Sequence, residues 1–280
     1  NDQSPSTKDI NSGFSAQVNY ALGDYTVTSI TAYRNWKNSQ VRDGDFRSDS
    51  PTYVATGALA GDIRTADYGR LNFDEFTQEL RLASPTGQFF EYVGGLYYYH
   101  TWESNYFTRT VTSCTSSTLA PVILGALGTA TPCAPGSSTY AQNQGIGEFS
   151  ATLTNYAAFG QGTLNFSERF RGIVGARWTQ DKIEFVHRRL RTSGAAALSG
   201  VNPTFSGTGG TKADGWSGKV GLQYDVLPTV LAYGSFTRGY KGPAMNVFFN
   251  MQTTDNFGIA PETSDAYEVG AKTRLLDGRL

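Results

Sequence analysis

The sequence contains no run of about 18 apolar residues, the length that a membrane-spanning α-helix needs. Hydrophobic residues make up 39% of the chain and the mean hydropathy is -0.35. These values exclude a helical membrane protein but not a membrane β-barrel, because a barrel strand exposes only every second side chain to lipid.

Several signals of other protein classes are also missing. The net charge is -1, which gives no reason to expect a nucleic-acid partner. No phosphate-binding loop, dinucleotide fingerprint or nucleophile–base arrangement occurs in the sequence, so we do not expect an enzyme. The chain starts at Asn1 without a signal peptide and ends just after an Asp-Gly turn, so we expect an internal piece of a longer protein.

The chain instead alternates tight turns with long polar stretches. Turns are expected at 23–24, 85–88, 167–168, 227–228 and 276–278, and long loops at 38–73, 104–149, 187–213 and 240–261. Loops longer than about 15 residues are uncommon in compact soluble domains. Short turns on one side and long loops on the other are typical of outer-membrane β-barrels.

Segments rich in Tyr, Phe, Val and Thr separate these connections and predict strands. We expect about nine, at 12–22, 25–37, 74–84, 89–103, 150–166, 169–186, 214–226, 229–239 and 262–275. Side chains alternate clearly in the best of them. In 216–226 the residues Trp216, Val220, Leu222 and Tyr224 share one face, and Lys219, Gln223 and Asp225 share the other.

A soluble β-sandwich would show the same alternation, but its strands usually run only about five or six residues. Strands that cross a membrane need about 10 residues, and several of these are longer. Bacterial barrels close with an even number of strands, so an odd count again suggests missing strands. The predicted fold is all-β: an antiparallel, up-and-down transmembrane β-barrel, present as an internal fragment of about nine strands of a larger barrel.

Six stretches, in this order and spacing, resemble barrel strands of TonB-dependent outer-membrane receptors: Tyr25–Arg34, Phe76–Pro85, Phe90–Tyr98, Tyr156–Gln161, Tyr233–Lys241 and Pro261–Gly270. The resemblance covers nearly the whole chain outside the long loops. It implies a 22-stranded barrel with a plug, integral to the bacterial outer membrane and energised by the TonB–ExbB–ExbD complex. It also implies import of a scarce extracellular ligand, usually a ferric siderophore. These motifs are architectural, so the resemblance assigns no ligand-binding residue.

Cys114 and Cys133 are the only two cysteines, and both fall in the longest predicted loop. In an oxidising envelope compartment we expect them to form a disulfide, which would stabilise the loop by about 3 kcal/mol. The alternative is two independent buried thiols.

Charged residues of the strands form the second group of candidates. We expect Arg81, Arg171, Arg177, Lys219, Lys272 and Arg274 to face the barrel lumen, and Trp216, Val220, Leu222 and Tyr224 to face outer-membrane lipid. Ion pairs with Glu79, Asp181, Asp225 and Glu268 are the simplest role for the cations. Attraction of anionic ferric complexes is the alternative.

No metal or cofactor site is expected. Asp43, Asp45 and Asp49 lack the Gly and Glu spacing of a calcium-binding EF-hand loop. His100 and His187 could meet at a metal, but no Cys or carboxylate cluster accompanies them.

Three functions remain open. The leading hypothesis is a TonB-dependent transporter; the alternatives are a passive outer-membrane channel of the porin class and a surface β-protein that binds carbohydrate. The expected partners are outer-membrane lipid, the energising complex and an extracellular small-molecule ligand, with no nucleic acid.

Overall fold

The computed structural model describes residues 4–44, 52–54, 63–123, 129–132, 138–192, 198 and 200–274. Nine strands form one sheet: β1 (Ser6–Leu22), β2 (Tyr25–Asp43), β4 (Ile63–Ala83), β5 (Phe90–Ser117), β8 (Ser138–Asn165), β9 (Phe170–Arg191), β10 (Phe205–Leu227), β11 (Val230–Lys241) and β14 (Glu262–Thr273). Each strand pairs antiparallel with its neighbour in this order. The prediction of an all-β, up-and-down meander of nine strands is therefore confirmed.

The remaining regular elements are short and lie in the connections. β3 (Thr52–Val54), β6 (Val122–Ile123) and β7 (Thr129–Pro132) form a small separate sheet. β12 (Ala244–Met245) pairs with β13 (Gly258–Ile259), and the 3-10 turn η2 (Thr253–Asp255) lies between them. No helix in the described part of the chain is long and apolar enough to cross a membrane.

The strands extend further into the predicted loops than the sequence suggested. β5 was expected to end at 103 and continues to Ser117, while β8 was expected to begin at 150 and begins at Ser138. β2, β4, β9 and β10 are also extended on the same side. The sequence there is polar, which favoured loops. Backbone pairing does not require apolar side chains, so the ladder continues once the strands are aligned.

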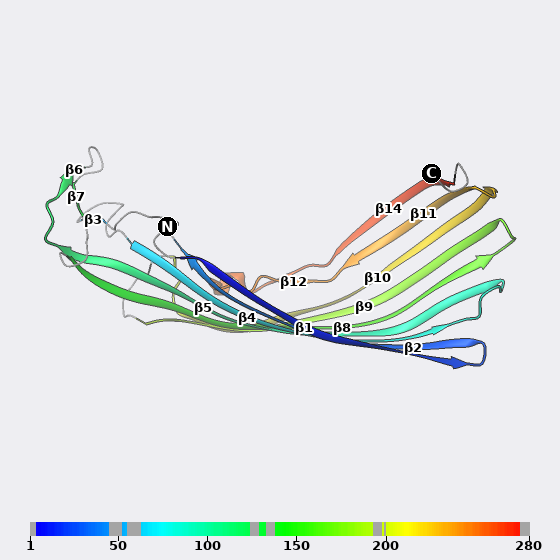
Figure 1. The fold of residues 1–280 in the computed structure, drawn as a ribbon, viewed down its shortest axis with the longest axis horizontal. Coiled ribbons are helices and arrows are strands. Elements are labelled where there is room, and N and C mark those ends of the chain that lie inside the picture. The colour runs from blue at the N-terminus through cyan, green and yellow to red at the C-terminus, as the bar shows by residue number, and fades with distance from the viewer. Residues whose placement is uncertain are drawn as a thin grey trace.

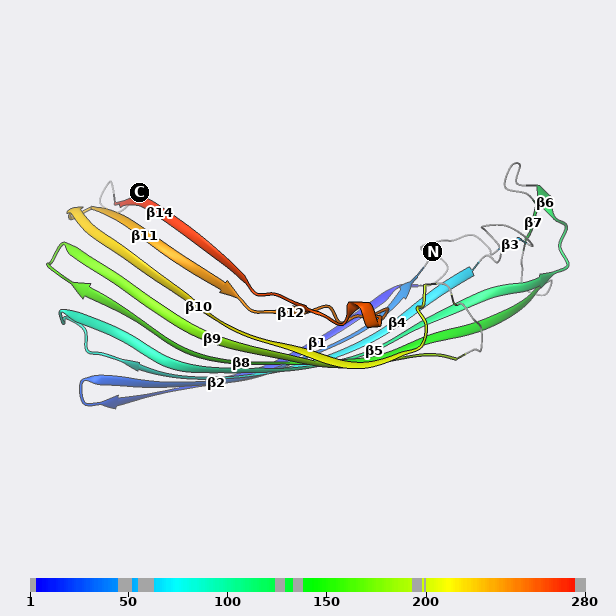
Figure 2. The ribbon, with the colours of Figure 1, turned by 180° about the vertical axis from the view of Figure 1, so that it is seen from behind.

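The sheet is curved into an open trough whose two ends differ (Figure 1). Tight turns join the strands at one end, and the longer connections join them at the other. Figure 2 shows the same arrangement from behind. The turns at 23–24, 85–88, 167–168 and 227–228 therefore share one rim, while 276–278 lies outside the described residues. The first turn uses Gly23 at φ 59°, a conformation that costs glycine little.

The convex face of the sheet carries an apolar band. Residues opposite one another in an antiparallel pair point to the same face, and Val220 lies opposite both Val174 and Phe236. Phe236 in turn lies opposite Tyr267. Large side chains of this face are exposed, with Phe14 at 64%, Leu96 at 61% and Trp216 at 63%. A continuous apolar surface of this kind requires a cover, because water would make it prone to association.

Two neighbouring glycines on β5 differ in how tightly the sheet packs around them. A Cβ atom added to Gly95 would lie 2.4 Å from the Leu80 carbonyl oxygen and 2.8 Å from the Phe159 ring. A Cβ atom added to Gly94 would make its nearest contact at 3.4 Å, an ordinary separation. Of these two positions, Gly95 has no room for a side chain, whereas Gly94 does.

We therefore expect Gly95→Ala to destabilise the folded barrel by about 1–3 kcal/mol, because the backbone of β4 or β5 must move. Gly94→Ala is the matched control and should change stability little. Denaturant unfolding of the full-length protein in detergent measures both. Equal stabilities of the two variants would contradict the packing described here.

Candidate functional site: the concave wall

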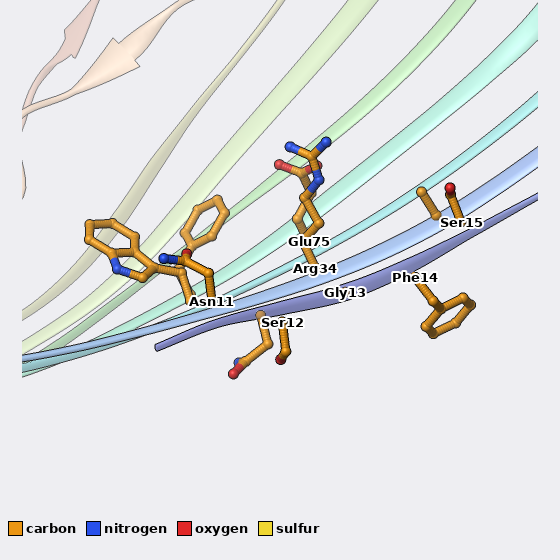
Figure 3. A pocket seen from close by; sticks show the side chains of 11 residues that line it. Asn11, Ser12, Gly13, Phe14, Ser15, Arg34 and Glu75 are labelled. Atoms are coloured by element: carbon orange, nitrogen blue, oxygen red, sulfur yellow. The ribbon is translucent and has the colours of Figure 1, made fainter. Parts of the chain in front are cut away.

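The concave face carries mostly polar and aromatic side chains. Figure 3 shows the alternation at the edge of the sheet: Asn11, Arg34 and Glu75 project to the concave side, whereas Ser12 and Phe14 project to the other side. An open groove of about 660 Å³ lies here. Gly13 lies in its lining, and a Cβ atom there would lie 2.7 Å from the Tyr33 carbonyl oxygen, so the close approach of β1 and β2 leaves no room for a side chain at this position.

A guanidinium–aromatic cluster lies further along the wall. The Arg177 guanidinium carbon lies 5.2 Å from the centre of the Tyr97 ring and 5.8 Å from that of Phe159. Tyr99 stacks next to Tyr97, with 6.5 Å between ring centres. Such a surface offers cation–π contacts, flat apolar rings and hydrogen-bond donors, which suits aromatic or anionic solutes.

Most of the six predicted lumen-facing cations have partners on this wall. Arg171 forms an ion pair with Asp225 at 2.8 Å, and Arg81 forms one with Glu79. The Lys272 ammonium lies 5.6 Å from the centre of the Tyr233 ring, whose hydroxyl donates to Glu268 at 2.7 Å.

Lys219 and Arg274 differ from the other four. Lys219 is exposed and forms no ion pair within the described part of the chain, although it shares the face of Arg171. The backbone N–H of Arg274 donates to the Thr229 carbonyl at 2.9 Å. That the concave face is the lumen remains a prediction, as does lipid contact by Trp216, Val220, Leu222 and Tyr224 on the convex face.

Two connections fold back onto the wall at the loop end of the sheet, and we call residues 200–204 and 242–257 the inner segments. Phe249 of the second inner segment contacts Phe107 with ring centres 4.5 Å apart. A Cβ atom at Gly147 would lie 2.6 Å from the Phe249 ring, so the absence of a side chain there makes room for it. Val201 of the first inner segment packs with Val111 and Leu198 in a small buried cluster beside Phe249.

Arg189 fixes both inner segments to β9. Its side chain is 1% exposed and donates to the carbonyl oxygens of Phe249 at 2.6 Å, Met251 at 2.8 Å and Pro203 at 2.7 Å. Burial, together with the neighbouring charge of Arg191, lowers the pKa of Arg189 from its ordinary value. The guanidinium thus binds backbone carbonyls of two separate connections at once.

Asp67 is a second buried centre that joins three strands to the first inner segment. It accepts hydrogen bonds from Arg109 at 2.7 Å and from Arg42 at 2.7 Å, and Arg109 also donates to the Gly200 carbonyl at 3.2 Å. Burial alone would raise the pKa of Asp67, but the two arginines outweigh it and hold the pKa below its usual range. The carboxylate therefore stays charged and keeps β2, β4 and β5 connected.

His187 is fully buried beneath the second inner segment. Its Nε2 atom donates to the Phe248 carbonyl at 2.9 Å, and its ring stacks on Phe149 with ring centres 5.3 Å apart. No hydrogen-bond partner of Nδ1 occurs among the described residues. Burial lowers the pKa of His187, and the charge of Arg189 adds to this effect.

The two histidines do not meet. His100 lies opposite Phe76 on the convex face, where its Nδ1 atom is 2.9 Å from the Thr154 hydroxyl, whereas His187 lies on the concave face. The alternative of a shared metal is therefore wrong. Cys133 lies outside the described residues and Cys114 is on β5, so the disulfide stays a prediction.

Sequence reasoning missed Asp67, Arg109 and Arg189, because 38–73, 104–149 and 187–213 were assigned to loops. One signal was present. His187, Arg189 and Arg191 alternate at every second position, as they would on one face of a strand that continued past 186.

A family model for the β-barrel of TonB-dependent receptor-like proteins matches residues 1–280. Among solved structures, the ferric yersiniabactin uptake receptor FyuA from Yersinia pestis superposes with a TM-score of 0.67 at 19% identity, covering 97% of this chain and 34% of that one. The siderophore receptor PiuA from Acinetobacter baumannii gives a TM-score of 0.58 at 16% identity, covering 97% of this chain and 38% of that one. At these identities the likeness shows the fold, and the chain spans little more than a third of either receptor.

The burial of His187 leads to a pH prediction for the second inner segment. Because the pKa of the docked imidazole is lowered, docking is fully stabilised above about pH 6.5, where the imidazole is neutral whether docked or released. As the pH falls below this value the released state binds the proton first, so docking is lost progressively toward the lowered pKa.

A spin label at Asn246→Cys in the full-length protein should therefore become more mobile in this acid range and recover on neutralisation. His187→Phe keeps an aromatic ring but removes the titration, so the mobility of the label should then be independent of pH. An unchanged acid transition in His187→Phe would assign the effect to another group.

Proposed function

Because the chain belongs to the TonB-dependent receptor family and matches its β-barrel, we propose that the full-length protein imports a scarce solute, most simply a ferric siderophore, across the bacterial outer membrane. The family consists of outer-membrane transport receptors rather than enzymes. The match over the whole chain is the observation that carries the proposal, and the named uptake receptors of the same fold support it.

The chemistry of the concave wall agrees with passage of a polar, aromatic or anionic solute. Arg177 between Tyr97 and Phe159 offers planar and cationic contacts, and Lys219 remains available for an anion. Arg189 anchors the inner segments to the concave wall at the loop end, and in a closed barrel they would obstruct free diffusion there, which suits selection of a ligand. Energy would come from TonB, ExbB and ExbD through a plug domain, as the family resemblance implies.

Uptake measurements test this function. In cells that carry the full-length gene, transcription should rise under iron starvation, and uptake of an iron-loaded siderophore should disappear when TonB is deleted. Uptake that persists without TonB would instead indicate a passive channel. A gene with no response to iron and no siderophore uptake would reject the siderophore as the substrate.

The proposed membrane placement assigns Leu222 to lipid and Gln223 to the lumen. Leu222→Arg should cost about 2–4 kcal/mol if it lies at mid-depth, because the charge would enter hydrocarbon, whereas Gln223→Arg should be mild. Unfolding of the full-length protein from bilayers of stated composition measures both variants. If the two substitutions changed the free energy of unfolding equally, the proposed placement of this strand in the membrane would be wrong.

A further inference from the structure

An open groove of about 1130 Å³ lies on the convex face at the loop end of β1, β2, β4 and β5, on the opposite side from the concave wall. Its lining includes three cationic side chains, Lys8, Lys37 and Arg70. Three adjacent strands each supply one of them. The groove is thus a feature of the paired sheet rather than of a single loop.

Strand register brings the three cations together. Ser39 of β2 lies opposite both Lys8 of β1 and Arg70 of β4. Lys37 lies on the same face of β2, two residues before Ser39, and is opposite Ile10 and Asn72. All three cations are exposed, and none forms an ion pair within the described part of the chain. The Arg70 guanidinium is held near the Tyr68 ring, with 5.1 Å between its central carbon and the ring centre.

Two carboxylates also line the groove and offset part of its positive charge. Asp74 accepts hydrogen bonds from Tyr33, from Asn35 at 2.8 Å and from Asn72 at 2.9 Å, and its charge also interacts with that of Lys37. Glu148 lies at the far edge, on β8. The lining therefore offers positive charge together with the hydroxyl groups of Ser39 and Ser104.

The groove is continuous with the apolar band. The groove lining includes Asn35 and Asp74, which lie opposite each other. Two residues closer to the turn end, the same face carries three aromatic side chains opposite one another: Phe14, Tyr33 and Phe76. Trp102, which lies opposite Asp74, is 60% exposed beside them. Aromatic side chains next to cations mark the depth at which acyl chains give way to charged headgroups.

We propose that this groove binds the phosphate of an anionic lipid headgroup, with Lys8, Lys37 and Arg70 as the phosphate contacts and the lipid's acyl chains lying on the apolar band. The inference rests on the proposed membrane placement. Charge complementarity and the continuity with the apolar band favour a lipid over a soluble anion, because a soluble ligand would gain nothing from the adjacent aromatic surface. The two serine hydroxyl groups suit a headgroup that also carries hydroxyls, such as a phosphorylated sugar.

Native mass spectrometry of the full-length receptor in a neutral detergent tests the site, with a bisphosphorylated lipid A as the probe and phosphatidylcholine as the neutral lipid. Loss of two surface cations in Lys37→Gln/Arg70→Gln should weaken lipid A binding by roughly 30-fold and leave phosphatidylcholine binding unchanged. Lys212→Gln, another exposed cation of the convex face but on β10, is the matched control and should bind lipid A as the wild type does.

If the double variant bound lipid A with wild-type affinity, the proposed binding site would be wrong. Competition by inorganic phosphate at the concentration of lipid A would also overturn it, since the groove would then recognise a soluble anion. Heat-dependent gel migration of each variant reports the folded barrel independently. A folded receptor that inserts into bilayers but binds no lipid A refutes this inference alone, whereas failure to insert refutes the proposed membrane function.

Discussion

The backbone hydrogen-bond ladder is the interaction on which the rest of this molecule depends. Hydrocarbon offers no partner to an N–H or C=O group, so a chain that crosses it with strands must pair every strand with its neighbours. The sheet meets this condition from β1 through β14, each inner strand being bonded on both sides. Within the described part of the chain, β1 and β14 each have one partner in the sheet, so their outer edges must be paired for a barrel to close.

Two chemically different faces follow from that ladder. Since side chains alternate and opposite residues share a face, a single register places Val174, Val220 and Phe236 together on the convex side. The same register gathers the ion pair of Arg171 and Asp225 and the cluster around Arg177 on the concave side. The loop end adds inner segments that are fixed by buried charge, with Arg189 on carbonyl oxygens and Asp67 between two arginines.

The sequence predicted the strand order, the turns and the two faces, because alternation and turn chemistry are local signals. It did not predict how far the strands extend. Polar stretches such as 104–117 resemble loops, and only pairing with a partner strand shows that they are extended. For the same reason Arg189 and Asp67 could not be identified as anchors, since the carbonyls and arginines that they bind lie far away in the sequence. The position of the charged groove on the convex face likewise depends on register, which brings Lys8 and Arg70 to either side of Ser39.

The central claim is that adjacent residues of one strand face lipid and lumen in turn. Spin labels at Leu222→Cys and Gln223→Cys, introduced separately into the full-length protein in lipid bilayers, test it most directly. We predict that the label at 222 collides readily with oxygen dissolved in the bilayer, and that the label at 223 collides with a water-soluble nickel complex. Equal access of both labels to the nickel complex would contradict the account.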